Sequence, residues 1–382
     1  MSGAVERHLR RGALVAVADG CGAPIGVGPL LADAARAVGG VRVLLGWSMT
    51  PAIDVHDAEA FPDIRTVMSG YALRAPVRDG RVRYLPTRLG SVPRLLAGTL
   101  RPDVLVAALR PGDRGLVFGS EVGWMRAAVD AGATVLAEVN HGLPAASDGI
   151  PVPAEQVVVI AETDQPPHQF TTNAPDAVAH AVAAHAAAMI PEGATLQYGP
   201  GTIADAILRA ITVPVHVDSG LVGDAVLDLD GRGLVLGTPR GAYLAGTQPL
   251  YDWADGRPML EPVEITHDVS RLAAHDCFVA VNTALEIDPV GQVNVERVGG
   301  QPVGGIGGHA DFALAASRSK RGISMIALPS THRAGPTLVE HLSAPVTTAR
   351  ADVDVIVTEH GVADLRGLDD HERERAIRAL WT

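Results

Sequence analysis

Short apolar runs alternate with helical segments along this chain, and that order constrains the fold more than any other feature. Residues 13–18 form an apolar run that breaks at residues 19–22, Asp-Gly-Cys-Gly. Residues 29–38 have helical spacing, two glycines end them, and residues 41–45 are the next apolar run. A strand–turn–helix–strand order is a βαβ unit, which predicts a parallel sheet.

The same alternation continues to the end of the chain, and 382 residues exceed one ordinary hydrophobic core. We therefore expect two similar open α/β domains, residues 1–190 and 191–382, divided at the Pro-Glu-Gly that begins at Pro191. Thr202 is a plausible N-cap for one of the predicted helices. Further strands are expected at 104–109, 134–139, 156–162, 194–197, 213–217, 277–281, 323–328 and 353–358, and helices at 124–131, 174–190, 203–211 and 369–380.

The amino-acid composition supports the α/β class and argues against a protein that binds nucleic acids or anionic membranes. Hydrophobic residues make up 47% of the chain and aromatics 4%, so the core is built from Ala, Val and Leu, as in buried parallel sheets. The net charge of −12 argues against a nucleic-acid or anionic-membrane partner, so a phosphorylated ligand would need a local basic patch.

Cysteine usage and hydropathy indicate the compartment. Cys21 and Cys277 are far apart and suggest no disulfide framework, so we expect both to fill core space in a reducing compartment. The chain starts with no secretory signal, and no apolar stretch approaches the length of a membrane span. These features predict a cytoplasmic protein.

Residues 281–312, VNTALEIDPVGQVNVERVGGQPVGGIGGHADF, concentrate the chemistry. A strand-like run ends at Glu286 and Asp288, and a turn leads to Gln292 and Asn294. Two acids and two amides beside bare backbone N–H groups suggest a site that holds an oxygen or an anion; the alternative is a hairpin with a solvated turn. The glycine cluster consists of Gly299, Gly300, Gly304, Gly305, Gly307 and Gly308.

Other patterns are weaker. The loop Tyr198-Gly-Pro-Gly-Thr202 opens a predicted helix, and a glycine loop there is a ready anion site. The glycines from Gly22 to Gly28 are a poor dinucleotide fingerprint, because a proline interrupts them and no acid ends the strand at 41–45. His180 and His185 are five apart and do not share a helix face, so no metal site is expected.

Longer blocks resemble a known family: NTALEIDPVGQVN (from Asn282), GIGGHADF, IALPST, APVTTARADVDVIVTEHGVADLRG and ERERA, in that order. Together with weaker upstream matches, they make the chain similar to the acetyl-CoA hydrolase/transferase family, which includes acetate, succinyl and 4-hydroxybutyrate CoA-transferases. The resemblance implies two CoA-transferase-type α/β domains with the active site between them. It also implies an acyl-CoA and a small carboxylate as substrates, coenzyme A as the carried group, no metal, and a homodimer or larger oligomer.

The resemblance also implies a mechanism. A glutamate attacks the thioester, a mixed anhydride and then a glutamyl-CoA thioester form, and an incoming carboxylate reverses the steps. Each tetrahedral intermediate needs N–H donors for its oxyanion, a role that the resemblance gives to Gly307 and Gly308. The expected contacts to coenzyme A are Gly199, Gly201, Thr202, Asn294, Gly305 and Arg333.

The family's glutamate is where this chain departs. The family segment resembles HSEMxSDGVVDL, and without gaps the chain reads DSGLVGDAVLDL from Asp218, which puts Gly220 at the glutamate position. A two-residue insertion would instead make Asp218 the acid. Glu286 is a second candidate acid and His309 a candidate base for water, each with a structural role as its alternative. CoA transfer is expected; the alternatives are acyl-CoA hydrolysis through Glu286, Asp218 or His309, and a non-catalytic CoA-thioester binder.

Overall fold

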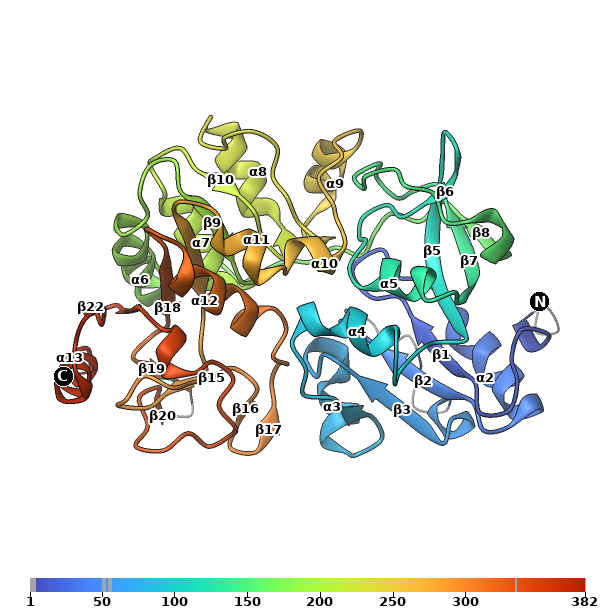
Figure 1. The fold of residues 1–382 in the computed structure, drawn as a ribbon, viewed down its shortest axis with the longest axis horizontal. Helices are drawn as coiled ribbons and strands as arrows, with labels where there is room; N and C mark the ends of the chain where they lie inside the picture. Colours follow the sequence, from blue (N-terminus) through green and yellow to red (C-terminus); the bar gives the residue numbers. More distant parts are fainter. Residues whose placement is uncertain (1–4, 50–52, 54–56, 334, 382) are drawn as a thin grey trace. The chain divides into compact units, whose positions relative to one another are not determined.

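A computed structural model describes residues 5–49, 53, 57–333 and 335–381 (Figure 1). Its contacts divide the chain into two compact units. Unit 1 comprises Met1–Phe170 and Ala242–Glu264, and unit 2 comprises Thr171–Gly241 and Ile265–Thr382. Each unit has a largely parallel sheet with helices, so the predicted α/β class is confirmed.

The sheet of unit 1 has the order β4-β3-β2-β1-β5-β7-β8, and β6 pairs with β5. All its pairings are parallel except that of β5 with β6. The strands are β1 (Leu14–Val17), β2 (Arg42–Leu45), β3 (Asp63–Thr66), β4 (Arg83–Tyr84), β5 (Val104–Gly112), β6 (Gly115–Val117), β7 (Thr134–Asn140) and β8 (Val157–Thr163).

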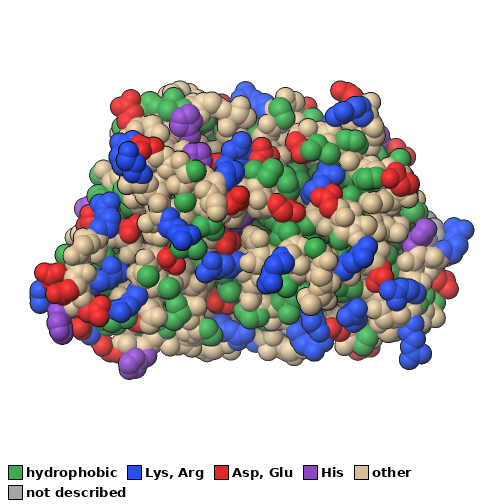
Figure 2. Space-filling model, in the orientation of Figure 1, with side chains coloured by type: hydrophobic (Ala, Val, Ile, Leu, Met, Phe, Trp, Pro, Cys, Tyr) green, Lys and Arg blue, Asp and Glu red, His purple; other side chains and the backbone are tan. Residues whose placement is uncertain are grey.

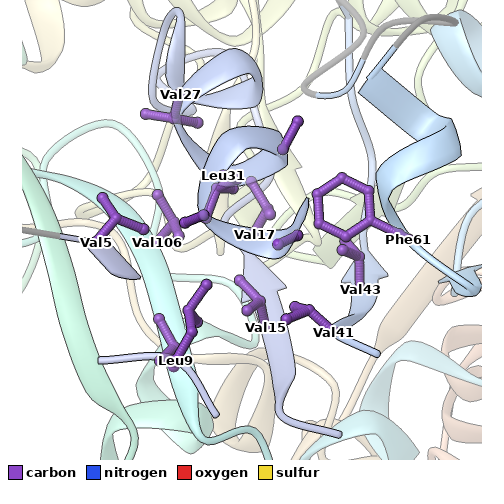
Figure 3. Packing of buried hydrophobic residues seen from close by; sticks show 14 of the residues in the cluster. Val5, Leu9, Val15, Val17, Val27, Leu31, Val41, Val43, Phe61 and Val106 are labelled. Carbon is purple, nitrogen blue, oxygen red and sulfur yellow. The ribbon is translucent and has the colours of Figure 1, made fainter. Parts of the chain in front are cut away.

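The core of unit 1 forms where helix α2 covers the middle of this sheet. Val15 and Val17 of β1 pack with Leu31 of α2, Val43 of β2 and Phe61 (Figure 3). Such Val-rich strands are buried because parallel sheets are covered by helices. The helices of this unit are α2 (Val27–Val38), α3 (Arg74–Arg78), α4 (Val92–Leu96), α5 (Met125–Asp130) and α9 (Gln248–Ala254), with 3₁₀ turns at Asp57–Ala60, Tyr71–Leu73, Leu89–Ser91 and Ala154–Gln156.

The sheet of unit 2 has the order β10-β9-β13-β18-β21-β22, with parallel pairings except between β21 and β22. Its strands are β9 (Thr195–Tyr198), β10 (His216–Val217), β13 (Phe278–Asn282), β18 (Ile323–Ala327), β21 (Val355–Thr358) and β22 (Gly361–Asp364). Short antiparallel pairs join β14 (Glu286–Ile287) to β15 (Val293–Asn294), β16 (Arg297–Val298) to β17 (Gln301–Pro302), and β19 (Thr331–His332) to β20 (Gly335–Pro336).

The helices of unit 2 are α6 (Ala177–Ala188), α7 (Thr202–Ala210), α8 (Asp224–Gly231), α11 (Val269–Ala273), α12 (His309–Arg318) and α13 (Asp370–Ala379), with a 3₁₀ turn at Arg350–Asp352. Helices α6, α7 and α13 match the predicted ranges, whereas α8, α11 and α12 were not predicted. The short α10 (Val263–Thr266), β11 (Leu221–Val222) and β12 (Tyr243–Leu244) complete the elements. Thr202 was expected to cap α7, and this is wrong: Gly201 is the N-cap, with φ of 129°, and Thr202 is the first helical residue.

The observed units differ from a division at residue 190. Residues 242–264 return to unit 1, where Val122 donates its backbone N–H to the carbonyl of Ala242 and Glu121 forms a β-bridge with Tyr243. The expected boundary falls inside unit 2, because α6 packs against α7 and β21. A sequence carries no local signal for a segment that leaves one unit and rejoins it later.

Sheet order places the glycine loops at particular strand ends. In unit 2, β9 lies between β10 and β13, so the chain moves to one side of β9 and later crosses to the other. Ligands of open α/β sheets bind outside the carboxyl ends of strands at such a switch point. The loop after β9, Gly199-Pro-Gly-Thr202, begins there. In unit 1, β1 occupies the same position between β2 and β5 and is followed by Asp19 and Gly20.

Two acids are buried near this strand end of unit 1. Asp19 Oδ2 accepts hydrogen bonds from the Trp47 backbone N–H (2.8 Å) and from Trp124 Nε1 (2.9 Å). Glu121 Oε2 accepts one from the backbone N–H of Gly22 at 3.1 Å. Burial raises the pKa of Asp19 to about 6 and that of Glu121 to about 8. Glu121 is therefore mostly protonated at neutral pH.

This pKa predicts a pH dependence of stability. The folded protein holds the Glu121 proton more tightly than the unfolded chain, whose glutamates titrate near pH ~4.3. The stabilisation is therefore complete below that pH and is lost as pH rises toward about 8. In Glu121→Gln, the free energy of unfolding in urea should fall less between pH ~5 and pH ~8 than in the wild type. The exposed Glu155→Gln is the control; equal slopes for wild type and Glu121→Gln would contradict the assignment.

Candidate functional site

The loop between β9 and α7 lies at the switch point of unit 2. The backbone N–H of Gly199 donates to the carbonyl of Val281 on β13 (3.1 Å), which joins the ends of the two strands. Asn282, the last residue of β13, exchanges side-chain hydrogen bonds with Gln197 at 3.2 and 3.3 Å. The first turn of α7 therefore opens at this edge, and its N–H groups suit an anionic ligand.

The glycine cluster forms one hairpin turn and one helix start. Glu286 and Asn294 face each other across the β14–β15 hairpin, which confirms the predicted turn. Gly299 and Gly300 have φ of 55° and 77° and join β16 to β17, as expected for a turn with positive φ at both central residues. The remaining glycines of the cluster lead into α12.

Gly308 is the N-cap of α12, and close packing explains why it is glycine. Its φ is −90°, which any residue can adopt. A Cβ atom there would lie 2.5 Å from Phe312 Cε2 and 2.6 Å from His267 Nε2, closer than real Cβ contacts come. Gly307, by contrast, has φ of 56° and is favoured by its conformation. The two residues predicted to hold the oxyanion thus lie where the backbone N–H groups of α12 begin.

Gly220 faces the same two rings. A Cβ atom at Gly220 would lie 3.3 Å from His267 Nε2 and 3.5 Å from Phe312 Cε2. The preceding residue, Ser219, is fixed by its hydroxyl, which donates to the carbonyl of Tyr198 at 3.0 Å. A side chain at position 220 would therefore extend toward the start of α12, as the family's reaction requires of its glutamate. The gapless register stays a prediction.

Asp218, the acid of the alternative register, is held in an ion-pair network. Its carboxylate contacts Arg271 at 2.6 and 2.9 Å, Arg240 at 3.2 Å and His275 at 3.5 Å. Burial alone would raise its pKa, but the hydrogen bonds from Arg271 and His275 and the two arginine charges hold the pKa of Asp218 at about 2. So stable a carboxylate is a weak nucleophile and a weak base.

Glu286 is anchored as well. Its Oε1 accepts from the Ser343 hydroxyl at 2.6 Å, and its Oε2 accepts from the Ser343 backbone N–H and from Asn294 Nδ2, both at 2.9 Å. Burial opposes these bonds, yet they lower the pKa of Glu286 overall. Asn294 also donates to the carbonyl of Arg297 and accepts from the N–H of Glu296. These contacts to Ser343 and Asn294 fit the structural alternative for Glu286.

His309 uses both ring nitrogens within unit 2. Nε2 lies 3.2 Å from the carbonyl of Thr283 and Nδ1 lies 2.7 Å from the Thr348 hydroxyl. A carbonyl only accepts, so Nε2 carries the proton and Nδ1 accepts from Thr348. Burial lowers the pKa of His309 to about 4, which keeps the ring neutral. This geometry ties α12 to the end of β13, and a role as base on water remains a prediction.

The other predicted residues lie in separate places. Gly305 belongs to the loop before α12, and Arg333 is exposed in the turn after β19. Figure 2 shows lysine and arginine side chains interspersed with acidic ones on the face in view. In the described ranges, no helix is both long and apolar enough to cross a bilayer. Cys21 and Cys277 are buried and unpaired, as predicted.

His267 was not among the predicted residues. It follows α10 in the sequence ITHDV, which carries no motif. Its proximity to Gly220 and Gly308 depends on the packing of α11 on α12, which no local pattern specifies. The same holds for Arg240 and Arg271, which converge on Asp218 from distant parts of the chain.

Comparisons with known proteins identify relatives of this chain. Residues 246–380 match the model of the acetyl-CoA hydrolase/transferase C-terminal domain. The 4-hydroxybutyrate coenzyme A transferase of Clostridium kluyveri is 31% identical over 81% of this chain and 76% of its own length. The acetyl-CoA hydrolase of Kluyveromyces lactis is 25% identical over 81% and 70%.

Solved structures extend the likeness to the whole fold. RipA from Yersinia pestis has a TM-score of 0.90 and 25% identity, over 100% of this chain and 93% of that one. The 4-hydroxybutyrate CoA-transferase from Porphyromonas gingivalis has a TM-score of 0.78 and 26% identity, over the same shares of the two chains. Fold and relatives together define an enzyme of acyl-CoA chemistry. More narrowly, the chain belongs to the acetyl-CoA hydrolase/transferase family, which confirms the resemblance seen in its sequence.

The gapless register makes a direct prediction. In Gly220→Glu, the new carboxylate should lie beside the start of α12 and form an enzyme-bound CoA thioester from acetyl-CoA. Borohydride reduction followed by peptide mass spectrometry should find the modified residue at position 220. Leu221→Glu, one residue along, is the matched control and should give no adduct. A folded, CoA-binding Gly220→Glu protein without the adduct would argue for the other register.

Proposed function

We propose that this protein transfers coenzyme A from an acyl-CoA to a small carboxylic acid. The observation that carries the proposal is the convergence of Gly220 and Gly308 on the same two rings. It brings the family's nucleophile position next to the N–H groups that would hold an oxyanion. Family membership supplies the class of reaction.

Because position 220 has no carboxylate, we propose that the acceptor makes the first attack itself. An oxygen of the acceptor carboxylate attacks the thioester carbon, and the oxyanion is held at the start of α12. The C–S bond breaks, leaving a mixed anhydride and CoA thiolate. The thiolate then attacks the acceptor's carbonyl carbon and expels the original acyl group as a carboxylate. No residue of the chain is acylated in this sequence.

Hydrolysis is the second candidate, and Gly220 also favours it. Without a carboxylate at position 220, water can attack the thioester carbon over the same N–H groups. One relative carries the name acetyl-CoA hydrolase. Asp218, Glu286 and His309 remain the proposed bases for this route, although each is engaged by neighbouring groups.

Further assignments rest on the sequence and the family. We infer that coenzyme A lies against the loop after β9 and the glycine loop before α12, with Gly199, Gly201, Thr202, Asn294, Gly305 and Arg333 as contacts. The first turn of α7 supports the placement of coenzyme A at the loop after β9, because helix N-termini bind phosphate. We also infer a cytoplasmic location, consistent with the two free buried cysteines, and a homodimer or larger assembly.

A steady-state assay tests the proposal. Acetyl-CoA is mixed with propionate, succinate or 4-hydroxybutyrate; chromatography follows new acyl-CoA, and a thiol reagent follows free CoA. We expect new acyl-CoA without accumulation of thiol, and double-reciprocal plots that intersect, because both substrates must be bound together. Parallel plots with a reducible enzyme thioester would contradict direct attack. Thiol release without new acyl-CoA would establish hydrolysis, and CoA binding without either product would indicate a binding protein.

A further inference from the structure

His267 lies where a functional group facing the start of α12 is expected. It follows α10, and its ring packs on that of Phe312 with centroids 4.7 Å apart. Helices α11 and α12 pack together and hold the two rings in place (Figure 1). The Nε2 edge of His267 points at both Gly220 and Gly308, and any larger residue at position 308 would collide with it.

The distances bring His267 Nε2 close to position 220. From standard bond lengths, a glutamate oxygen lies about 3–4 Å from its own Cβ. His267 Nε2 lies 3.3 Å from the Cβ position of residue 220. The Nε2 atom therefore lies, from another element, within the reach of a side chain at position 220.

The protonation state of His267 decides what it can do there. The ring is 4% exposed, and burial lowers its pKa to about 3, with Asp218 opposing and Arg271 adding to the shift. A general base works best with a pKa near the working pH, so the neutral ring is a poor base. Nδ1 lies 2.9 Å from the Thr266 hydroxyl, which can donate to it. When the Thr266 hydroxyl donates in this way, the ring proton is on Nε2, the nitrogen that faces Gly220 and Gly308.

We propose that His267 is a catalytic residue whose Nε2–H donates a hydrogen bond to the thioester carbonyl oxygen, beside the N–H groups at the start of α12. The inference rests on the proposed acyl-CoA chemistry. It applies to CoA transfer and to hydrolysis alike, because both reactions develop the same oxyanion. A neutral imidazole polarises a carbonyl without first losing a proton, and it remains a donor across the working pH range.

Two substitutions of His267 distinguish hydrogen-bond donation by its ring from a role as a base or in packing. His267→Ala should lower kcat about 10²–10³-fold and change KM for acyl-CoA only a few-fold. His267→Gln should recover at least about tenfold of that loss, because an amide donates a hydrogen bond but is no base. The exposed His180→Gln on α6 is the control and should leave kcat unchanged. Thermal melts establish that each variant is folded.

A spectroscopic measurement keeps this inference separate from the proposed turnover. A ketone analogue of acetyl-CoA, ¹³C-labelled at the carbonyl and unable to react, is bound and its carbonyl stretch is recorded by infrared difference. We expect a shift to lower frequency in the wild type, its loss in His267→Ala and partial return in His267→Gln. If the wild-type protein shows no turnover, the proposed function is overturned. The carbonyl stretch of the bound analogue still tests whether His267 donates a hydrogen bond, because it requires no turnover. An unchanged kcat or stretch in folded His267→Ala, or a His267→Gln no better than His267→Ala, overturns the inference.

Discussion

Strands β9 and β13 lie side by side in the sheet of unit 2, and their parallel pairing determines where a ligand can be held. The chain leaves β9 toward one side and returns to β13 on the other, so the two carboxyl ends open at one edge. Gly199 is joined to Val281 there by a backbone hydrogen bond. The N-terminus of α7 begins at this edge, where the fold offers N–H groups to a charged ligand.

The start of α12 depends on a second constraint, the packing of two rings against glycines. Phe312 and His267 leave no room for a Cβ atom at Gly308 and little at Gly220. The acids and the base that a sequence reader would choose are bound to other partners: Asp218 to arginines, Glu286 to Ser343 and His309 to Thr283 and Thr348. This unit therefore combines two glycine loops with a glycine at position 220, and the lack of a carboxylate there is why we propose attack by a substrate and not by the enzyme.

Much of the fold could be predicted from the sequence because it depends on local patterns. Strands such as β1 and β13 are short apolar runs bounded by glycine or polar residues, and α13 begins with a capping box at Asp369. What could not be predicted depends on tertiary contact. The return of residues 242–264 to unit 1 and the approach of His267 to Gly308 involve residues far apart in the chain. Likewise, Asn294 lies near Glu286 in the sequence, but Ser343, the other partner of Glu286, is 57 positions away.

We propose that a thioester carbonyl is held at the start of α12, opposite Gly220, which offers no nucleophile. A crystal structure with a non-reactive ketone analogue of an acyl-CoA tests it most directly. We expect the carbonyl oxygen within about 3 Å of a backbone N–H at Gly307 or Gly308 and of His267 Nε2, with no carboxylate of the chain against the carbonyl carbon. A carbonyl bound away from α12, or one in contact with Glu286 or Asp218 as nucleophile, would contradict it.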